Sequence, residues 1–326
     1  MRTLIVIVNY RTPDLTIECL RSLSPEVAKS PRTQVVVVDN ASPDDSVPRL
    51  GEAIRTLSFD PWCHLLPMPQ NGGFAYGNNA GISWANANGT SAARSEFDLV
   101  WLLNPDTIVL EGALQSLERH MRENPSVGIG GSRIVNLDGS TRLSAFRFPS
   151  ALGELESIMS LRLASRVLRR FVIAPPAPSQ ATRVDWVSGA SMMVRAPVFA
   201  QIGLLDEDYF MYFEETDFCL RAARSGIECW YLPEGRIVHL VGKSSGVTGT
   251  ARSKKRRPGY WFASRGRYFR RNLGSAAFHA ANLLWLLAYP LGSLLLAARG
   301  RKRDDAPLLW WDFLRFNYFY PARDSN

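Results

Sequence analysis

Residues 4–40 read LIVIVNYRTPDLTIECLRSLSPEVAKSPRTQVVVVDN and set the fold of this chain. Residues 4–9 and 34–40 are short, β-branched runs between polar turns, which is typical of strands buried on both faces. Between them, residues 13–24 carry apolar side chains at helical spacing. The order strand, helix, strand predicts a parallel sheet, and ligands of such sheets gather at the carboxyl ends of the strands.

Outward from this unit, further strands are predicted at residues 64–68, 99–104, 127–134 and 184–194, and residues 42–45 predict the cap and first turn of a second helix. Polar side chains follow three of the predicted strands. They are Asn9 and Tyr10, Asp39 and Asn40, and Asn104 to Asp106. Their convergence on one edge of the sheet is the first sign of a binding site.

The composition is that of a packed globular protein, with 326 residues, 46% of them apolar and 21% charged. It excludes a disordered chain, a disulfide scaffold and a collagen-like protein. The net charge of +8 is uneven, because residues 236–303 hold 15 Lys and Arg and no acid. The other 23 bases face all 30 acids, so an acidic body carries a basic tail. A uniformly basic nucleic-acid binder would not show this pattern.

The four cysteines are scattered and form no C-x-x-C pair, which favours buried thiols in a reducing compartment. A strand-like run begins almost at the N-terminus, so we expect no secretory signal and a cytoplasmic catalytic region. Residues 148–183 combine a Leu- and Arg-rich helical segment with the proline-rich run APPAP. We expect them to form a mobile excursion over the active site.

Residues 71–81 read NGGFAYGNNAG ahead of a predicted helix. Glycines let a backbone approach a ligand closely, and helix N-termini favour phosphate, although a simple tight turn explains the stretch equally well. Asn104-Pro105-Asp106 follows an apolar strand, where a carboxylate can hold Mg²⁺ or Mn²⁺ against a diphosphate. The alternative for these three residues is an Asx-Pro turn with a helix cap.

Residues 206–217 are acidic and aromatic, and a carboxylate among aromatic rings tends to a raised pKa, as a general base requires. The alternatives are acids that complement a helix dipole and an i,i+4 pair between Asp217 and Arg221. His239 ends the strand predicted at 236–239. A lone histidine is more often structural, but this one ends a strand in a chain with only four histidines.

These motifs, with the residues DWVSGA at 185–190, occur in the order found in family 2 glycosyltransferases of GT-A fold. Residues 1–245 closely resemble this family, especially its bacterial rhamnosyltransferase-like branch. The resemblance implies an α/β fold with a Rossmann-like, mostly parallel central sheet flanked by helices. It also implies transfer of a sugar, with inversion, from a nucleotide-diphosphate donor to an acceptor hydroxyl.

The resemblance implies a role for each motif. Asp106 and His239 would hold Mg²⁺ or Mn²⁺, with Asn104 in place of the first Asp of the usual D-x-D motif. Glu215 or Glu214 would be the general base, where the family more often has Asp. Acceptor and sugar contacts would come from Trp186, Asp217 and Arg221. The donor would contact Asn9, Tyr10, Asp39, Asn40, Asn71, Gly72, Gly73, Phe74, Asn78, Asn104 and Asp106.

Residues 246–326 form a basic, helical extension that we expect to associate with a membrane. Residues 273–298 carry no charge and are long enough to span a bilayer, but basic flanks on both sides and the interruptions at Pro290 and Gly292 favour a re-entrant or surface-lying helical hairpin. Residues 308–316 are amphipathic, as in an interfacial helix. The alternative is a helical pair packed on the catalytic domain. Nucleic acid is not an expected partner, since no RNA-binding module accompanies the basic residues.

The sequence therefore predicts an inverting glycosyltransferase at the cytoplasmic face of the inner membrane, acting on a lipid-linked or cell-envelope glycan. The family suggests dTDP-rhamnose as donor and a polyprenyl-diphosphate-linked acceptor. Two alternatives stay open: a sugar nucleotidyltransferase, whose basic N-terminal signature is missing near Arg11, and a non-catalytic membrane-bound scaffold for glycans or nucleotides. The sequence does not indicate an oligomeric state.

Overall fold

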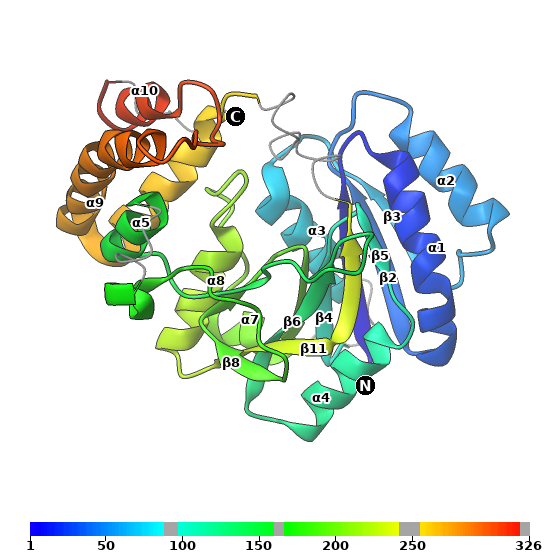
Figure 1. The fold of residues 1–326 in the computed structure, drawn as a ribbon. Coiled ribbons are helices and arrows are strands. Elements are labelled where there is room, and N and C mark those ends of the chain that lie inside the picture. The colour runs from blue at the N-terminus through cyan, green and yellow to red at the C-terminus, as the bar shows by residue number, and fades with distance from the viewer. Residues whose placement is uncertain (88–96, 160–165, 241–254, 320–326) are drawn as a thin grey trace.

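A computed structural model describes residues 1–87, 97–159, 166–240 and 255–319 (Figure 1). The described strands of the central sheet lie in the order β3-β2-β1-β4-β10-β6-β11-β5, with β8 beside β11. The strands are β1 (Thr3–Asn9), β2 (Thr33–Asp39), β3 (Cys63–Pro67), β4 (Leu99–Leu103), β5 (Thr107–Val109), β6 (Val127–Val135), β8 (Thr182–Val184), β10 (Ser191–Arg195) and β11 (Glu228–His239). A small second sheet pairs β7 (Ala145–Phe146) with β9 (Trp186–Val187).

The first half of the sheet is parallel, as the order of strand, helix and strand predicts. β1 pairs in parallel with β2 and β4, and β2 with β3. β10 runs antiparallel between β4 and β6, while β6 and β11 are again parallel. The segment predicted as one strand at 184–194 is divided among β8, β9 and β10, because the Ser188-Gly189-Ala190 turn interrupts it.

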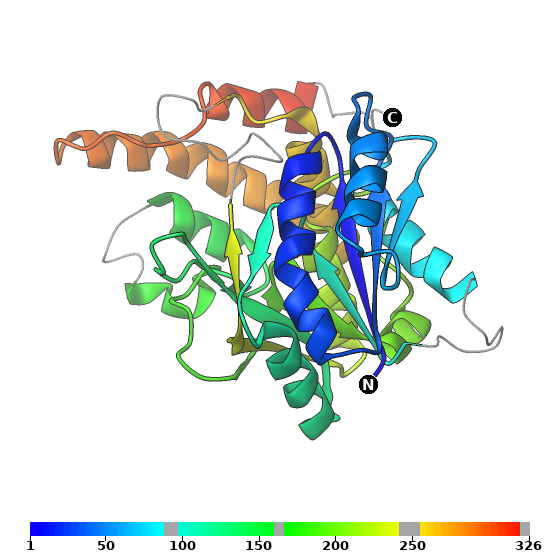
Figure 2. The same ribbon diagram turned by 90° about the vertical axis from the view of Figure 1, so that its right-hand side faces the viewer.

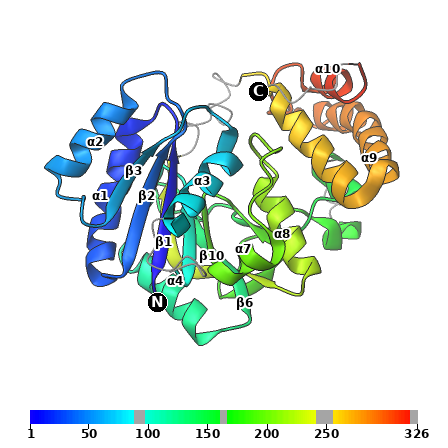
Figure 3. The same cartoon turned by 180° about the vertical axis from the view of Figure 1, so that it is seen from behind.

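Helices cover both faces of the sheet because its central strands are apolar on both sides. Ile5 and Ile7 pack with α1 (Pro13–Lys29), α2 (Ser46–Thr56) and α4 (Ala113–Glu123), whose side faces the viewer in Figure 2. Leu4 and Val6 pack with α3 (Gly73–Ala87), α7 (Ala196–Ile202) and α8 (Glu214–Arg224), which are seen from behind in Figure 3. All four cysteines are free and buried, as expected.

Two helix starts differ from the sequence prediction. α2 begins at Ser46, with residues 42–45 as the turn before it. α3 begins at Gly73, so most of the Gly- and Asn-rich stretch is helix and only its first two residues precede it. The physical reason is close packing: a Cβ on Gly77 or Gly81 would overlap the side chains of Val8 and Val6 on β1. These glycines bring the helix onto the sheet.

The segment predicted as an excursion is partly regular. It contains α5 (Ala151–Met159) and a 3-10 turn (Arg169–Phe171), and residues 160–165 lie outside the described part of the chain. α5 packs against α9, so this segment is not only the extended excursion over the active site that the sequence predicted (Figure 1).

The C-terminal region is helical, with α9 (Gly259–Ala297), α10 (Leu309–Leu314) and a π-helix (Arg315–Phe319). The expected break at Pro290 and Gly292 is wrong, because the helix continues through both residues. It bends instead at Gly274, whose φ of 87° and ψ of 163° are non-helical. The two halves of α9 contact each other there, with Arg265 donating to Asn282 over 2.6 Å. The boundary predicted at 245/246, with Arg252 and Lys254 of the basic run, lies outside the described residues.

Many tail arginines pair with acids of the protein itself. The ion pairs join Arg265 to Glu154 of α5, Arg267 and Arg271 to Asp206, and Arg256 to Asp312 of α10. The basic tail and the acidic body therefore neutralise each other across their shared interface. Arg299, Arg301 and Lys302 are among the bases that stay exposed.

Candidate active site

A cavity of about 620 Å³ opens at the carboxyl edge of β1 and β4 and beside the start of α3. It is lined by residues from separate motifs of the sequence: Tyr10, Asn40, Asn71, Gly73, Phe74, Asn104, Asp106, Glu214, Glu215 and His239. The strand ends converge because Asn9 is in register with Asp39, and Ile7 with Leu103. Four predicted donor contacts, Asn9, Asp39, Gly72 and Asn78, do not line the cavity.

Asn9 and Asp39 bind each other beneath the rim. The Asn9 amide donates to the Asp39 carboxylate over 2.7 Å, and the Ser42 backbone N–H donates to the other carboxylate oxygen over 2.9 Å. The side-chain Oδ1 of Asn9 in turn accepts a hydrogen bond from Thr16 Oγ1 over 2.9 Å. Both side chains are buried. In this structure they order the loops that follow β1 and β2.

Asn40 connects the end of β2 to the start of α3. Its amide donates to Asn71 Oδ1 over 3.0 Å and to the Gly73 carbonyl over 2.9 Å. The side-chain Oδ1 of Asn40 is buried and has no hydrogen-bond partner among the described residues. A ligand donor in the cavity could satisfy this acceptor, because a buried carbonyl without a partner is costly.

The start of α3 requires glycine at position 73. Gly73 has a φ of +89°, and a Cβ there would overlap the backbone carbonyl of Phe210. The Phe74 backbone N–H donates to that same carbonyl over 2.9 Å. The helix is therefore docked on the loop that precedes α8. Asn78 is buried one turn further on and donates to the Phe74 carbonyl over 2.9 Å, so it supports the helix from within.

Asp106 and His239 face one position at the cavity wall. His239 Nε2 lies 3.1 Å from Asp106 Oδ1, and the Asn104 amide nitrogen lies 3.4 Å from the same imidazole. A carboxylate and an imidazole at this spacing fit Mn²⁺ or Mg²⁺. Within the described residues no three His, Cys, Asp or Glu side chains gather around one point. A cation here would take its remaining ligands from water and substrate phosphates, as Mg²⁺ usually does.

Glu214 and Glu215 begin α8 after two strained residues. Tyr212 and Phe213 have φ values of 71° and 70°, which is uncommon for bulky residues and strains the backbone. This turn brings both carboxylates to the cavity. One oxygen of each is buried without a hydrogen-bond partner among the described residues. Glu215 also lines a second, adjoining cavity.

Burial raises the pKa of both carboxyls above the ordinary value for glutamate. For Glu214 the neighbouring Glu215 charge adds to the effect of burial and raises its pKa well above that value. For Glu215 the backbone amides of Glu215, Gly189 and Thr216 oppose burial and moderate the rise in pKa. Glu215 is only partly buried, whereas Glu214 is 4% exposed. Glu215 is thus the carboxylate better placed to take a proton from a bound hydroxyl.

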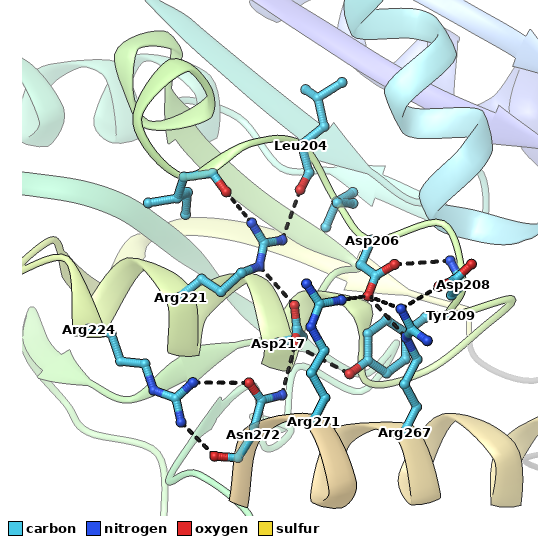
Figure 4. Close-up of polar contacts among 12 residues, drawn as sticks. Leu204, Asp206, Asp208, Tyr209, Asp217, Arg221, Arg224, Arg267, Arg271 and Asn272 are labelled. Carbon is cyan, nitrogen blue, oxygen red and sulfur yellow. Dashed lines mark hydrogen bonds and ion pairs between the residues drawn. The ribbon is translucent and has the colours of Figure 1, made fainter.

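Asp217 and Arg221, which we expected at the acceptor, lie together in a polar network that includes Asn272 (Figure 4). Arg221 Nε donates to Asp217 over 2.8 Å and its other nitrogens donate to backbone carbonyls of residues 202 and 204. Asn272 of α9 donates to the other Asp217 oxygen over 2.8 Å. Neither Asp217 nor Arg221 lines either cavity. Their contacts match the alternative given by the sequence, an ion pair between residues four positions apart on one helix.

Trp186 lines the second cavity with Glu215, in keeping with an acceptor position. Sequence reasoning missed Tyr212, which lines both cavities, and Tyr260 of α9, whose ring lies 6.2 Å from the Tyr212 ring. The aromatic run at 209–213 was a signal for Tyr212. No local pattern connects Tyr260, which comes from the tail, to a site built at the strand ends.

A family model described as glycosyl transferase family 2 matches residues 4–170, about half of the chain. The chain belongs to glycosyl transferase family 2. The chain is also similar to solved glycosyltransferases. It aligns with a mannosyltransferase from Pyrobaculum calidifontis in complex with GDP-Man and Mn²⁺, at a TM-score of 0.56 and 16% identity, over 92% of this chain and 75% of the other. The fold is therefore GT-A.

Two curated relatives are similar over most of the chain. A low-salt glycan biosynthesis hexosyltransferase, Agl10, of Haloferax volcanii is 29% identical over 68% of this chain and 62% of its own length. An N-acetylglucosaminyl-diphospho-decaprenol L-rhamnosyltransferase of Mycobacterium tuberculosis is 27% identical over 74% of this chain and 77% of its own. The match thus spans less than two thirds of the Haloferax protein.

Proposed function

We propose that this protein is an inverting glycosyltransferase that moves a sugar from a nucleotide-diphosphate donor to a hydroxyl of a lipid-linked glycan. The observation that carries the proposal is that Asp106 and His239 line the same cavity as Glu214 and Glu215, together with the start of α3. Family membership supports the reaction class. The names of the mycobacterial relative and of a dTDP-rhamnosyl transferase of Shigella flexneri support dTDP-rhamnose as the donor and a polyprenyl diphosphate as the acceptor carrier.

In the proposed reaction Glu215 takes the proton of the acceptor hydroxyl as its oxygen attacks the anomeric carbon. The bond from that carbon to the diphosphate breaks on the opposite face, and its electron pair leaves with the nucleoside diphosphate. Asp106 and His239 would hold Mg²⁺ or Mn²⁺, and such a cation would supply positive charge against the leaving diphosphate. Asn40 and the backbone at Gly73 hold the nucleotide end, and Tyr212 orients the acceptor sugar.

We place the protein at the cytoplasmic face of the membrane, with residues 1–245 as the catalytic domain and 246–326 as the associating region. α9 is long and apolar enough to cross a bilayer by length and composition. Its exposed leucines at 283, 287, 291 and 294 share one helix face, next to the exposed bases Arg299, Arg301 and Lys302. An apolar face beside basic residues supports a helix that lies on an anionic membrane surface.

The test is transfer from dTDP-rhamnose to a synthetic N-acetylglucosaminyl-diphosphoryl-undecyl acceptor, with the product measured by mass spectrometry. We expect Glu215→Gln to reduce the rate about 10²- to 10⁴-fold, because a general base contributes that much. The acid limb of kcat/KM should lie above the ordinary glutamate pKa, since burial raises the pKa of Glu215 and the base must be deprotonated. EDTA should abolish transfer, and Mn²⁺ or Mg²⁺ should restore it.

The matched control is Glu52→Gln, which removes an exposed carboxylate on α2 and should leave the rate unchanged. A Glu215→Gln variant that transfers rhamnose at the unmodified rate would exclude Glu215 as the base. A protein that binds the donor but transfers no sugar to any lipid-linked acceptor would contradict the proposed function as a whole.

A further inference from the structure

A second cavity, of about 390 Å³, adjoins the first, and Tyr212 and Glu215 line both. Its opposite wall comes from the C-terminal region, through Arg257, Trp261, Trp285, Tyr289, Arg303 and Leu309. This region lies beyond the residues that match the family model. The tail therefore builds a binding space that reaches the proposed catalytic base, and this space is large enough for a small ligand.

Arg257 is the unusual group in this cavity. Its Nε atom is buried and has no hydrogen-bond partner among the described residues. Within the same residues, no carboxylate forms an ion pair with its guanidinium, which lies 4.4 Å from the centre of the Trp261 ring. Burial lowers the pKa of Arg257, although Tyr212 and Asp305 oppose this. A buried guanidinium nitrogen without a hydrogen-bond partner is costly unless a ligand supplies an acceptor.

The neighbouring arginines differ from Arg257. Arg256 pairs with Asp312. Arg303 lies 3.6 Å from Asp305 and donates to Ser293 and to the Ile158 carbonyl. Two arginines line this cavity. Arg303 has an ion-pair partner, and Arg257 has none among the described residues. Guanidinium groups bind phosphate oxygens with two parallel hydrogen bonds, which makes phosphate the fitting class of ligand.

Aromatic rings form much of the remaining wall, which also includes Glu154, paired with Arg265, and Asp305, paired with Arg303. Trp285 stacks on Tyr289 with ring centres 4.9 Å apart, and on Phe313 at 3.9 Å. Trp186 stacks on Phe146 at 4.2 Å on the side nearer the catalytic domain. Rigid aromatic walls beside Arg257, the lining arginine without an ion-pair partner among the described residues, suit a ligand that joins an anionic group to an apolar or sugar face.

We propose that this second cavity binds the phosphate-bearing end of the acceptor, with Arg257 on its phosphate oxygens and the acceptor sugar directed toward Glu215. The inference rests on the proposed function and names its acceptor as a glycosyl phosphate or diphosphate on an apolar carrier. The second half of α9 supplies Trp285 and Tyr289 to the cavity and also carries the exposed leucines, so one helix offers both the cavity wall and an apolar surface for the carrier chain.

The test is calorimetric binding in EDTA, without donor, so that neither metal nor catalysis contributes. The probes are N-acetylglucosaminyl-diphosphoryl-undecane, the uncharged undecyl N-acetylglucosaminide and inorganic diphosphate. We expect Arg257→Ala to weaken binding of the diphosphoryl probe about 10- to 100-fold, as for a charged hydrogen-bonded pair. Arg257→Lys should recover part of this loss. Binding of the uncharged glycoside should not change.

Lys255→Ala is the matched control, because it removes an exposed positive charge two residues away and should bind like the unmodified protein. Equal affinity of Arg257→Ala and unmodified protein for the diphosphoryl probe would overturn the proposal. Inorganic diphosphate that binds as tightly as the lipid-linked probe would also overturn it, since the site would then serve free diphosphate. Because no transfer is measured, absent catalysis would contradict the proposed function without affecting this result.

Discussion

At the scale of single residues, the two adjacent glutamates at the start of α8 differ in their surroundings. Glu214 is almost fully buried beside a like charge, and both factors raise its pKa. Glu215 opens to two cavities and receives backbone hydrogen bonds. The sequence left the choice of base open between them. The greater exposure of Glu215 favours it as the base. The buried Glu214 carboxylate, by contrast, destabilises the folded state at neutral pH, because burial disfavours its charged form.

We expect Glu214→Gln to increase the free energy of unfolding at pH 8 and to change it little near pH 4. A carboxyl whose folded pKa is raised contributes no penalty below its unfolded pKa, and stability is lost as pH rises through the folded pKa. Each unit of raised pKa corresponds to about 1.4 kcal/mol. Urea unfolding at both pH values measures the effect, and a gain of the same size at both would contradict it.

The control at this scale is Asp217→Asn, because Asp217 is as buried as Glu214 but pairs with Arg221. It should lose about 3 to 5 kcal/mol of stability, as when one partner of a buried ion pair is removed. The opposite signs of the two substitutions would separate a carboxylate kept for chemistry from one kept for structure.

At the scale of elements, the junction between β2, α3 and the loop before α8 shapes the donor end of the cavity. Asn40 holds the start of α3, and Gly73 lets its backbone contact Phe210. The glycines of the Gly- and Asn-rich stretch have no side chains, so this helix can pack directly against the Phe210 carbonyl and the valines of β1. The stretch was predicted to precede a helix, because close packing on β1 cannot be read from its composition.

Gly73→Ala should destabilise the protein by about 2 to 5 kcal/mol and weaken donor binding. A left-handed φ costs alanine about 1 to 2 kcal/mol, and overlap with the Phe210 carbonyl adds about 1 to 3 kcal/mol. Gly139→Ala is the matched control, since Gly139 has a φ of +81° but nothing within 4 Å of a Cβ. Equal losses in urea unfolding for the two variants would show that the overlap at Gly73 does not matter.

At the scale of the whole molecule, the C-terminal helices have two roles on opposite faces. The inner face carries Trp285 and Tyr289 toward the second cavity, and the outer face exposes leucines. Arg267 and Arg271 fix the first half of α9 to Asp206 (Figure 4). The tail is therefore part of the wall of the proposed acceptor site, and its paired arginines are not available to lipid.

The double variant Leu287→Glu, Leu294→Glu should reduce sedimentation with phosphatidylglycerol vesicles by more than tenfold. The two leucines are 63% and 69% exposed, and burying each in an apolar phase contributes about 1.5 to 3 kcal/mol. Leu137→Glu with Val167→Glu is the control, because these side chains are 79% and 73% exposed outside the tail. Unchanged vesicle binding of the first variant would exclude this face as the membrane contact.

The sequence predicted most of the catalytic half of the molecule. The positions of β1, β2, β3, β4 and β6 were predicted within about one residue, whereas β5 was missed and β11 begins eight residues before the strand predicted at 236–239. Polar side chains after β1, β2 and β4 converge because those strands are parallel. The bend at Gly274 and the antiparallel β10 were not predicted. Both depend on contacts with distant segments, and Pro290, which has the stronger local signal, is accommodated within α9.

The sequence by itself determined the fold class and the motifs that border the first cavity, because strand periodicity and polar strand ends are local properties. Only the tertiary structure decided which of those residues face the cavity. It placed Asn9, Asp39 and Asp217 in supporting contacts, and it brought Tyr260 of the tail to the first cavity and Arg257 to the second. These placements follow from long-range packing and ion pairing, which no local pattern encodes.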